Sequence, residues 1–178
     1  MLDSAADPVS APKAYQDLLI GLVGDDDPAD IQAATPDLLR TLLTDAGADL
    51  RTRPEAGEWS VAECVAHIVD AEIVSSGRYR WILAHDEPEI VPYDQDLWVD
   101  RLHQPVEDVE SLLAVFEPMR RANLELWART PVAERARFGI HLERGPESYE
   151  LTFVLIAGHD RFHLAQARAA LAHIRAQG

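Results

Sequence analysis

A capping box marks the start of one long helix in this chain of 178 residues. Ser60 and Glu63 have the spacing at which each side chain accepts the backbone N–H of the other, and Trp59 precedes them at the position of a hydrophobic staple. Helical periodicity then continues to about residue 84. The apolar stripe of this helix consists of Val61, Val65, Ile68, Ser75, Tyr79 and Ile82, and His67 lies on the shoulder of that stripe.

Three further segments have helical periodicity, so we expect an all-α, four-helix bundle. The first is predicted to start at Thr35, an N-cap followed by Pro36, and to end at Gly47. The next is predicted to begin near Pro105, with acidic residues in its first turn that favour the helix dipole. The last is predicted over about residues 149–175.

The residues before this bundle are predicted to form an N-terminal extension. The apolar run over residues 15–23 is closed by Gly24, and it predicts a short helix packed against the outside of the domain. We therefore assign residues 1–34 to the extension and residues 35–178 to the bundle domain.

Two connections between helices are long. The one over residues 86–104 has close to twenty residues, too many for a tight turn, and we interpret it as a crossover from one end of the bundle to the other. The segment 138–146 is interpreted as a loop that returns the chain to the last helix. A short strand pair around residues 138–142 is the only extended structure that the pattern favours.

Composition excludes several classes of function. The formal net charge is −15, and no basic run is longer than Arg120-Arg121, so a nucleic-acid partner is not expected. The single cysteine, Cys64, excludes an intramolecular disulfide and a cysteine-rich zinc ribbon. Histidine and carboxylate side chains must therefore supply the ligands of any metal site.

Hydropathy gives no sign of a membrane segment. No stretch approaches the roughly 20 uninterrupted apolar residues that a membrane span needs, and the first residues lack the basic and apolar regions of a signal peptide. We therefore expect a cytoplasmic protein that does not associate with a membrane.

A pair of histidines in the last predicted helix is the strongest indication of chemistry. His159 and His163 are four residues apart, so their imidazoles project from one face at neighbouring heights and can share one metal ion. A third ligand must come from another element, and His67 is the candidate because it lies on a second long helix. With 7 histidines in the chain, the spacing alone also fits an ordinary buried or surface pair.

Four ordered blocks of the sequence resemble the DinB/YfiT-like metalloenzymes of the DinB superfamily. These blocks are residues 59–72, 93–98, 141–145 and 159–166, and the resemblance extends over about residues 35–172. It implies a bundle of up-down-down-up order with a three-histidine metal centre, which falls here on His67, His159 and His163. It also implies nickel or zinc as the ion, a small-molecule substrate, a homodimer, and relatives that include thiol-dependent S-transferases.

The chemistry of such a centre follows from its ligands. Three neutral imidazoles leave a divalent ion with its full charge and at least one open coordination position. The ion can then activate either a water molecule or a low-molecular-weight thiol cosubstrate as a nucleophile. We therefore expect a metal-dependent enzyme, either hydrolase-like or a thiol-dependent S-transferase. The alternative is a non-catalytic, metal-bearing binding or stress-response module.

Several other side chains are candidates for this site. Asp160, Glu72 and Asp94 are candidate proton acceptors, although Asp160 can instead be a surface or subunit-contact carboxylate and Glu72 an ordinary ion-pair partner of an arginine. Tyr93, Trp98 and His141 are candidate substrate-binding residues. Tyr93 and Trp98 can instead pack into the core, and His141 can instead form a hydrogen bond with nearby backbone.

Overall fold

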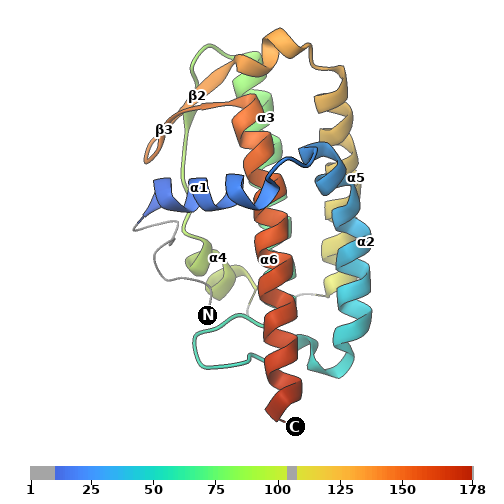
Figure 1. The fold of residues 1–178 in the computed structure, drawn as a ribbon. Coiled ribbons are helices and arrows are strands. Elements are labelled where there is room, and N and C mark those ends of the chain that lie inside the picture. The colour runs from blue at the N-terminus through green and yellow to red at the C-terminus, as the bar shows by residue number, and fades with distance from the viewer. Residues whose placement is uncertain (1–10, 104–107, 178) are drawn as a thin grey trace.

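The computed structural model describes residues 11–103 and 108–177. Its bundle consists of α2 (Pro28–Ala46), α3 (Val61–Ala84), α5 (Val109–Arg129) and α6 (Tyr149–Gln177). In Figure 1, α2 and α6 run in one direction along the bundle while α3 and α5 run in the other. The predicted up-down-down-up four-helix bundle is therefore confirmed. None of the described helices is both long enough and apolar enough to span a bilayer.

The predicted capping box is present at the start of α3. The Ser60 N–H donates to Glu63 Oε2 at 2.7 Å, and the Glu63 N–H donates to Ser60 Oγ at 3.3 Å. Arg53 Nε donates to the same carboxylate at 3.0 Å, so the buried glutamate has a cationic partner. Every residue from 61 to 72 is buried, because α3 packs against both α5 and α6 along this stretch.

The first bundle helix begins earlier than the predicted start at Thr35. Asp27 caps it by accepting a backbone N–H of the first turn at 2.7 Å, and Pro36 lies inside the helix. The Thr35 hydroxyl oxygen lies 3.1 Å from the Ile31 carbonyl one turn back within the helix, so this threonine is no cap. The predicted start was wrong because Asp27-Pro28 carries the same capping signal eight residues upstream.

The third bundle helix begins at Val109, later than the predicted start near Pro105. Asp108 lies outside the helix and caps it by accepting the Glu110 N–H at 3.3 Å. Residues 104–107, which include Pro105, lie outside the described part of the chain.

The crossover and the return segment before the last helix both contain regular structure. Their elements are β1 (Glu89–Ile90), α4 (Gln95–Leu102), β2 (Phe138–His141) and β3 (Gly145–Ser148). β1 pairs in parallel with β2, which pairs antiparallel with β3. The short strand pair predicted around residues 138–142 is therefore present, and the segment interpreted as a return loop is a β-hairpin. Two 3₁₀ segments, Gly47–Arg51 and Val132–Ala136, complete the connections. The crossover is thus tied to the hairpin by a small sheet beside the helical bundle (Figure 1).

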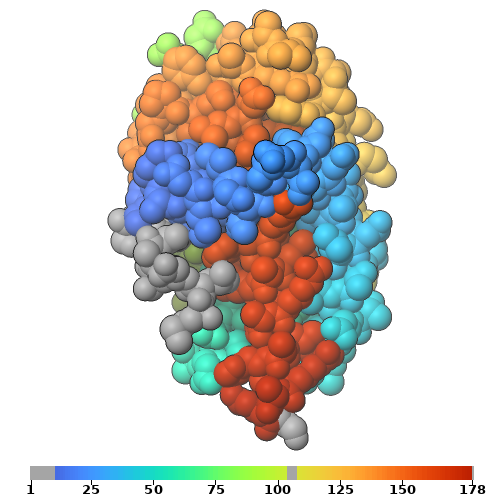
Figure 2. Space-filling view, in the orientation of Figure 1, coloured from blue at the N-terminus to red at the C-terminus, as the bar shows by residue number. Residues whose placement is uncertain are grey.

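The predicted short N-terminal helix is α1 (Pro12–Val23), and it crosses α6. Figure 2 shows α1 as a blue band over the orange-red α6. At the crossing, a Cβ atom on Gly158 would lie 2.1 Å from the Leu19 carbonyl oxygen, so the close approach requires glycine. The predicted boundary after residue 34 lies within α2, and the division into extension and bundle domain stays a prediction.

One buried arginine connects all four bundle helices. Arg120 of α5 donates from Nε to Glu72 of α3 at 3.0 Å and from Nη2 to Asp160 of α6 at 3.2 Å. Its Nη1 donates at 3.1 Å to the Gln32 carbonyl of α2, which lacks a helical N–H partner because residue 36 is proline. Burial alone lowers the pKa of Arg120, but Asp160 and Glu72 outweigh that cost and raise the pKa above its ordinary value.

The two carboxylates in this network have further donors. Asn123 Nδ2 donates to Glu72 Oε1 and the Thr35 hydroxyl donates to Asp160 Oδ2, each at 2.7 Å. Buried ion pairs are tolerated when their remaining lone pairs are satisfied in this way. The network therefore fixes the separation and register of the four helices at one level of the bundle.

We expect Arg120→Met to lower the free energy of unfolding by about 3–5 kcal/mol, because it leaves two buried carboxylates without their cation. The matched variant Arg121→Met removes the same charge from an exposed neighbour on α5, and should change stability by less than about 0.5 kcal/mol. Urea unfolding followed by circular dichroism measures both variants. Equal stabilities would show that the network does not hold the helices together.

Candidate metal centre

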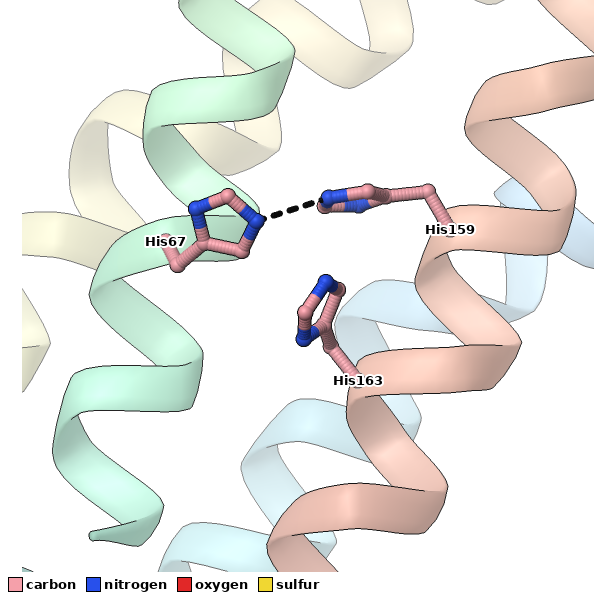
Figure 3. Close-up of side chains that lie close together, drawn as sticks. All are labelled: His67, His159 and His163. Atoms are coloured by element: carbon pink, nitrogen blue, oxygen red, sulfur yellow. Dashed lines mark hydrogen bonds between the residues drawn. The ribbon is translucent and has the colours of Figure 1, made fainter. Parts of the chain in front are cut away.

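The bundle brings three histidines from two helices to one point. His67 lies in the second turn of α3, and His159 and His163 lie one turn apart near the middle of α6. All three side chains are buried, and their ligand nitrogens lie within 4.8 Å of one another. Figure 3 shows the imidazole of His67 facing the two imidazoles of α6 across the space between the helices. The sequence predicted these residues as neighbours, and the fold places them together.

The hydrogen bonds of the three rings leave an Nε2 lone pair free on His163. Nε2 of His67 lies 2.8 Å from Nε2 of His159 (Figure 3). Nδ1 of His163 bonds Gln166 Oε1 at 2.8 Å, and because that oxygen only accepts, the proton is on Nδ1 and Nε2 carries a lone pair. This buried Nε2 has no partner among the described residues. Nitrogens that share one zinc ion at about 2.0–2.1 Å lie roughly 3 Å apart, so the donor set fits a divalent ion.

Burial keeps these imidazoles neutral. It lowers the pKa of His163 to about 4, and it lowers the pKa values of His67 and His159 well below the ordinary value. Repulsion between neighbouring rings acts in the same direction on His67 and His159. Metal ligands must be deprotonated, so the environment prepares all three rings for coordination at neutral pH.

Trp59 forms a wall of the histidine cluster, a role that the sequence did not indicate. Its ring stacks on His163 with centroids 5.8 Å apart and an interplanar angle of 23°, and it lies 5.0 Å from the ring of His67. The sequence assigned Trp59 to a staple at the helix start. Trp59 precedes the N-cap of α3, so helical periodicity gave no signal for this contact.

The candidate proton acceptors occupy different environments. Asp160 is buried and paired with Arg120, so the alternative that placed it on the surface or at a subunit contact is wrong. Glu72 is also paired with Arg120, as its alternative predicted. Asp94 is exposed and caps α4 by accepting the Leu97 N–H at 2.9 Å. Asp94 lines the cavity described next, whereas the oxygens of Asp160 and Glu72 are used by the arginine network.

A cavity of about 390 Å³ opens beside His159. Its walls come from α1, α3, the crossover, the hairpin and α6. Of the predicted substrate-binding residues, Tyr93 and His141 line the cavity, while Trp98 packs against Tyr93 with ring centroids 4.6 Å apart. The sequence did not indicate most of the other lining residues, among them Tyr15, Arg78 and Arg144. A small molecule in this cavity would lie against the histidine cluster.

The sequence is similar to several bacterial proteins that carry the name "Putative metal-dependent hydrolase". A relative from Oceanobacillus iheyensis is 25% identical over 131 residues, which span 73% of this chain and 76% of the relative. One from Geobacillus thermodenitrificans is 29% identical over 143 residues, spanning 74% and 75%. One from Bacillus cereus is 27% identical over 116 residues, spanning 65% and 66%.

The fold is similar to that of YfiT from Bacillus subtilis, described as a probable metal-dependent hydrolase with an unusual four-helix bundle topology. The TM-score is 0.75 at 20% identity, and the superposition covers 91% of this chain and 89% of YfiT. This likeness supports the bundle architecture. The match to the DinB superfamily runs from residue 31 to residue 167, most of the chain, and the protein therefore belongs to that superfamily.

Proposed function

We propose that this protein is a metal-dependent enzyme that hydrolyses a small molecule. The observation that carries the proposal is the convergence of three buried, neutral imidazoles beside a cavity of about 390 Å³. The names of the relatives support a metal-dependent hydrolase, and a cavity of this size suits a small molecule. We assign the ligand roles to His67, His159 and His163.

The residues around the ligands have separate tasks. Gln166 holds the His163 ring by its Nδ1 proton, which orients Nε2 toward the shared point. Trp59 covers the cluster on one side and excludes water there. A divalent ion held by these imidazoles would supply a Lewis acid with at least one open position. Of the three candidate proton acceptors, we retain Asp94, because its carboxylate lines the cavity and has no arginine partner in the described structure.

The metal itself is tested by elemental analysis of protein purified without a histidine tag. We expect about one nickel or zinc ion per chain, because imidazole ligands suit both ions. His67→Ala and His163→Ala should each lose the ion. His173→Ala is the matched control, since this histidine lies on the exposed end of α6, and it should keep the full metal content. Equal metal content in His67→Ala and His173→Ala would refute the centre.

The reaction class is tested by turnover of the metal-loaded protein on a panel of esters and amides. The proposal predicts hydrolysis without any added thiol, with at least about a hundredfold loss in His163→Ala, since the ion is then lost. Turnover that requires a thiol cosubstrate would favour the thiol-dependent S-transferase. A metal-loaded protein inactive in both assays, with a spectrum that substrates and thiols leave unchanged, would favour the non-catalytic module. The homodimer stays a prediction, checked by light scattering.

The metal-free protein is expected to lose stability on mild acidification. Unfolded histidine has a pKa near ~6.5, whereas burial lowers the pKa of His163 to about 4 in the folded chain. Between these values the unfolded chain binds more protons, so stability falls as the pH falls, by up to about 1.4 kcal/mol per pH unit for each such histidine. Urea unfolding at pH 7 and pH 5 measures the loss.

Two histidine variants, one at a buried position and one at an exposed position, provide the control for this pH dependence. His163→Phe removes one buried titrating group and should reduce the loss between pH 7 and pH 5. His173→Ala removes an exposed histidine and should leave the loss unchanged. A metal-free protein equally stable at both pH values would contradict the neutral, buried state of the cluster.

A further inference from the structure

Besides Nδ1 of His159, the side chains that line the cavity carry three buried polar atoms without partners among the described residues. They are Nε of Arg78, Nε2 of His141 and the hydroxyl of Tyr15, and each belongs to a side chain that lines the cavity. The exposed fractions of these residues are 9%, 1% and 8%. Buried polar atoms are nearly always hydrogen-bonded in native proteins, so three unpaired atoms at one cavity indicate a missing ligand.

All three atoms are hydrogen-bond donors. The Arg78 guanidinium can only donate, and the hydroxyl of Tyr15 has a proton to give. In His141, Nδ1 accepts the Glu143 N–H at 3.3 Å, so the proton of the neutral ring is on Nε2. The missing ligand must therefore present acceptor oxygens to this part of the cavity.

The charge of Arg78 has no carboxylate in contact with it within residues 11–103 and 108–177. Its Nη2 donates to the Val91 carbonyl at 3.1 Å. The buried Glu147 is nearby, but its oxygens accept from Arg144 Nη2 and Gln16 Nε2, each at 3.0 Å. Burial and the neighbouring Arg144 both lower the pKa of Arg78, because each makes its positive charge less favourable.

The balance of charges favours a ligand with one negative charge. The buried Arg78 and the partly buried Arg144 carry two positive charges against the one negative charge of Glu147, which leaves one positive charge at this end of the cavity. Asp94 and Glu143 also line the cavity, but both are exposed at its solvent side and would repel a dianion. A carboxylate meets these conditions, and its two oxygens suit the planar donors of an arginine.

We propose that this cavity binds a monocarboxylate by its head group, with Arg78, His141 and Tyr15 as the donors. The part of the ligand that reacts would then extend toward His159. That second statement rests on the proposed hydrolase function, whereas binding of the head group does not. The substrate class is accordingly a carboxylic acid that carries a hydrolysable bond at a distance from its carboxylate.

The geometry of α3 sets this distance. His67 and Arg78 are eleven residues apart, which is about 16 Å along a helix axis, and helical side chains lean toward the N-terminus, so the guanidinium reaches back toward the histidines. Apolar side chains of Leu19, Leu155 and Ile156 line the same cavity. The ligand should therefore have an apolar spacer between its carboxylate and its reacting bond.

Calorimetry on the metal-free protein tests the head-group site, because without the ion a carboxylate cannot bind by coordination. The probes are 4-phenylbutyrate and its neutral isostere 4-phenylbutanamide. We expect the wild-type chain to bind the carboxylate at least about tenfold more tightly than the amide, since hydrogen bonds to charged groups are the stronger ones. Arg78→Met should abolish this preference. Arg168→Met removes the same charge from an exposed site on α6 and should retain the preference.

Several outcomes overturn the proposal. These are no carboxylate preference in the wild-type chain, no binding at concentrations up to ~10 mM, or a preference that survives in Arg78→Met. Tighter binding of phenyl phosphate than of 4-phenylbutyrate overturns the assignment to a carboxylate. If Arg78→Met does not fold, Tyr15→Phe decides, and an unchanged preference overturns the three-donor site. The assay needs no metal, so it can succeed where the metal analysis fails, and the two proposals are judged separately.

Discussion

The ion pairs of Arg120 with Glu72 and Asp160 set the geometry on which the site depends. Asp160 is adjacent to His159 on α6, and Glu72 lies a little over one turn beyond His67 on α3. Because one guanidinium binds both carboxylates, it fixes the two histidine-bearing helices relative to each other. It also satisfies the α2 carbonyl left free by a proline. A group deep in the bundle thus holds the ligand-bearing faces in register without contacting the ligand nitrogens itself.

The cavity depends on segments outside the four helices. α1 crosses α6 at Gly158, the residue before His159, and contributes Tyr15 to the wall. The hairpin contributes His141, and its pairing with β1 ties it to the crossover that contributes Tyr93. The bundle supplies the histidine cluster, whereas α1, the crossover and the hairpin supply further walls of the cavity and additional hydrogen-bond donors. A helical bundle with a histidine cluster can therefore carry a pocket that is formed mostly by segments outside its four helices.

Sequence patterns predicted the helices well and their contacts only in part. The capping box placed the start of α3 correctly because the signal is local, a serine and a glutamate bonding each other's backbone. Thr35-Pro36 carried an equally good local signal and was wrong, since Asp27-Pro28 carries the same signal upstream and caps α2 there. The histidine spacing put two rings on one face. The closure of the cavity by α1 could not be predicted, because it depends on contacts between residues more than a hundred positions apart.

By itself the sequence determined the helical bundle, its long crossover and the positions of His67, His159 and His163, because periodicity and capping are properties of neighbouring residues. Only the tertiary structure decided that Asp160 and Glu72 are held by a buried arginine, that Trp59 covers the histidines, and that no carboxylate of the described residues contacts Arg78. The physical reason is that the hydrogen bonds and ion pairs of a buried charged or polar group depend on which residues, distant in the sequence, are packed beside it. The helical periodicity of the sequence determines which face of a helix a side chain occupies, and tertiary packing determines which residues that side chain contacts.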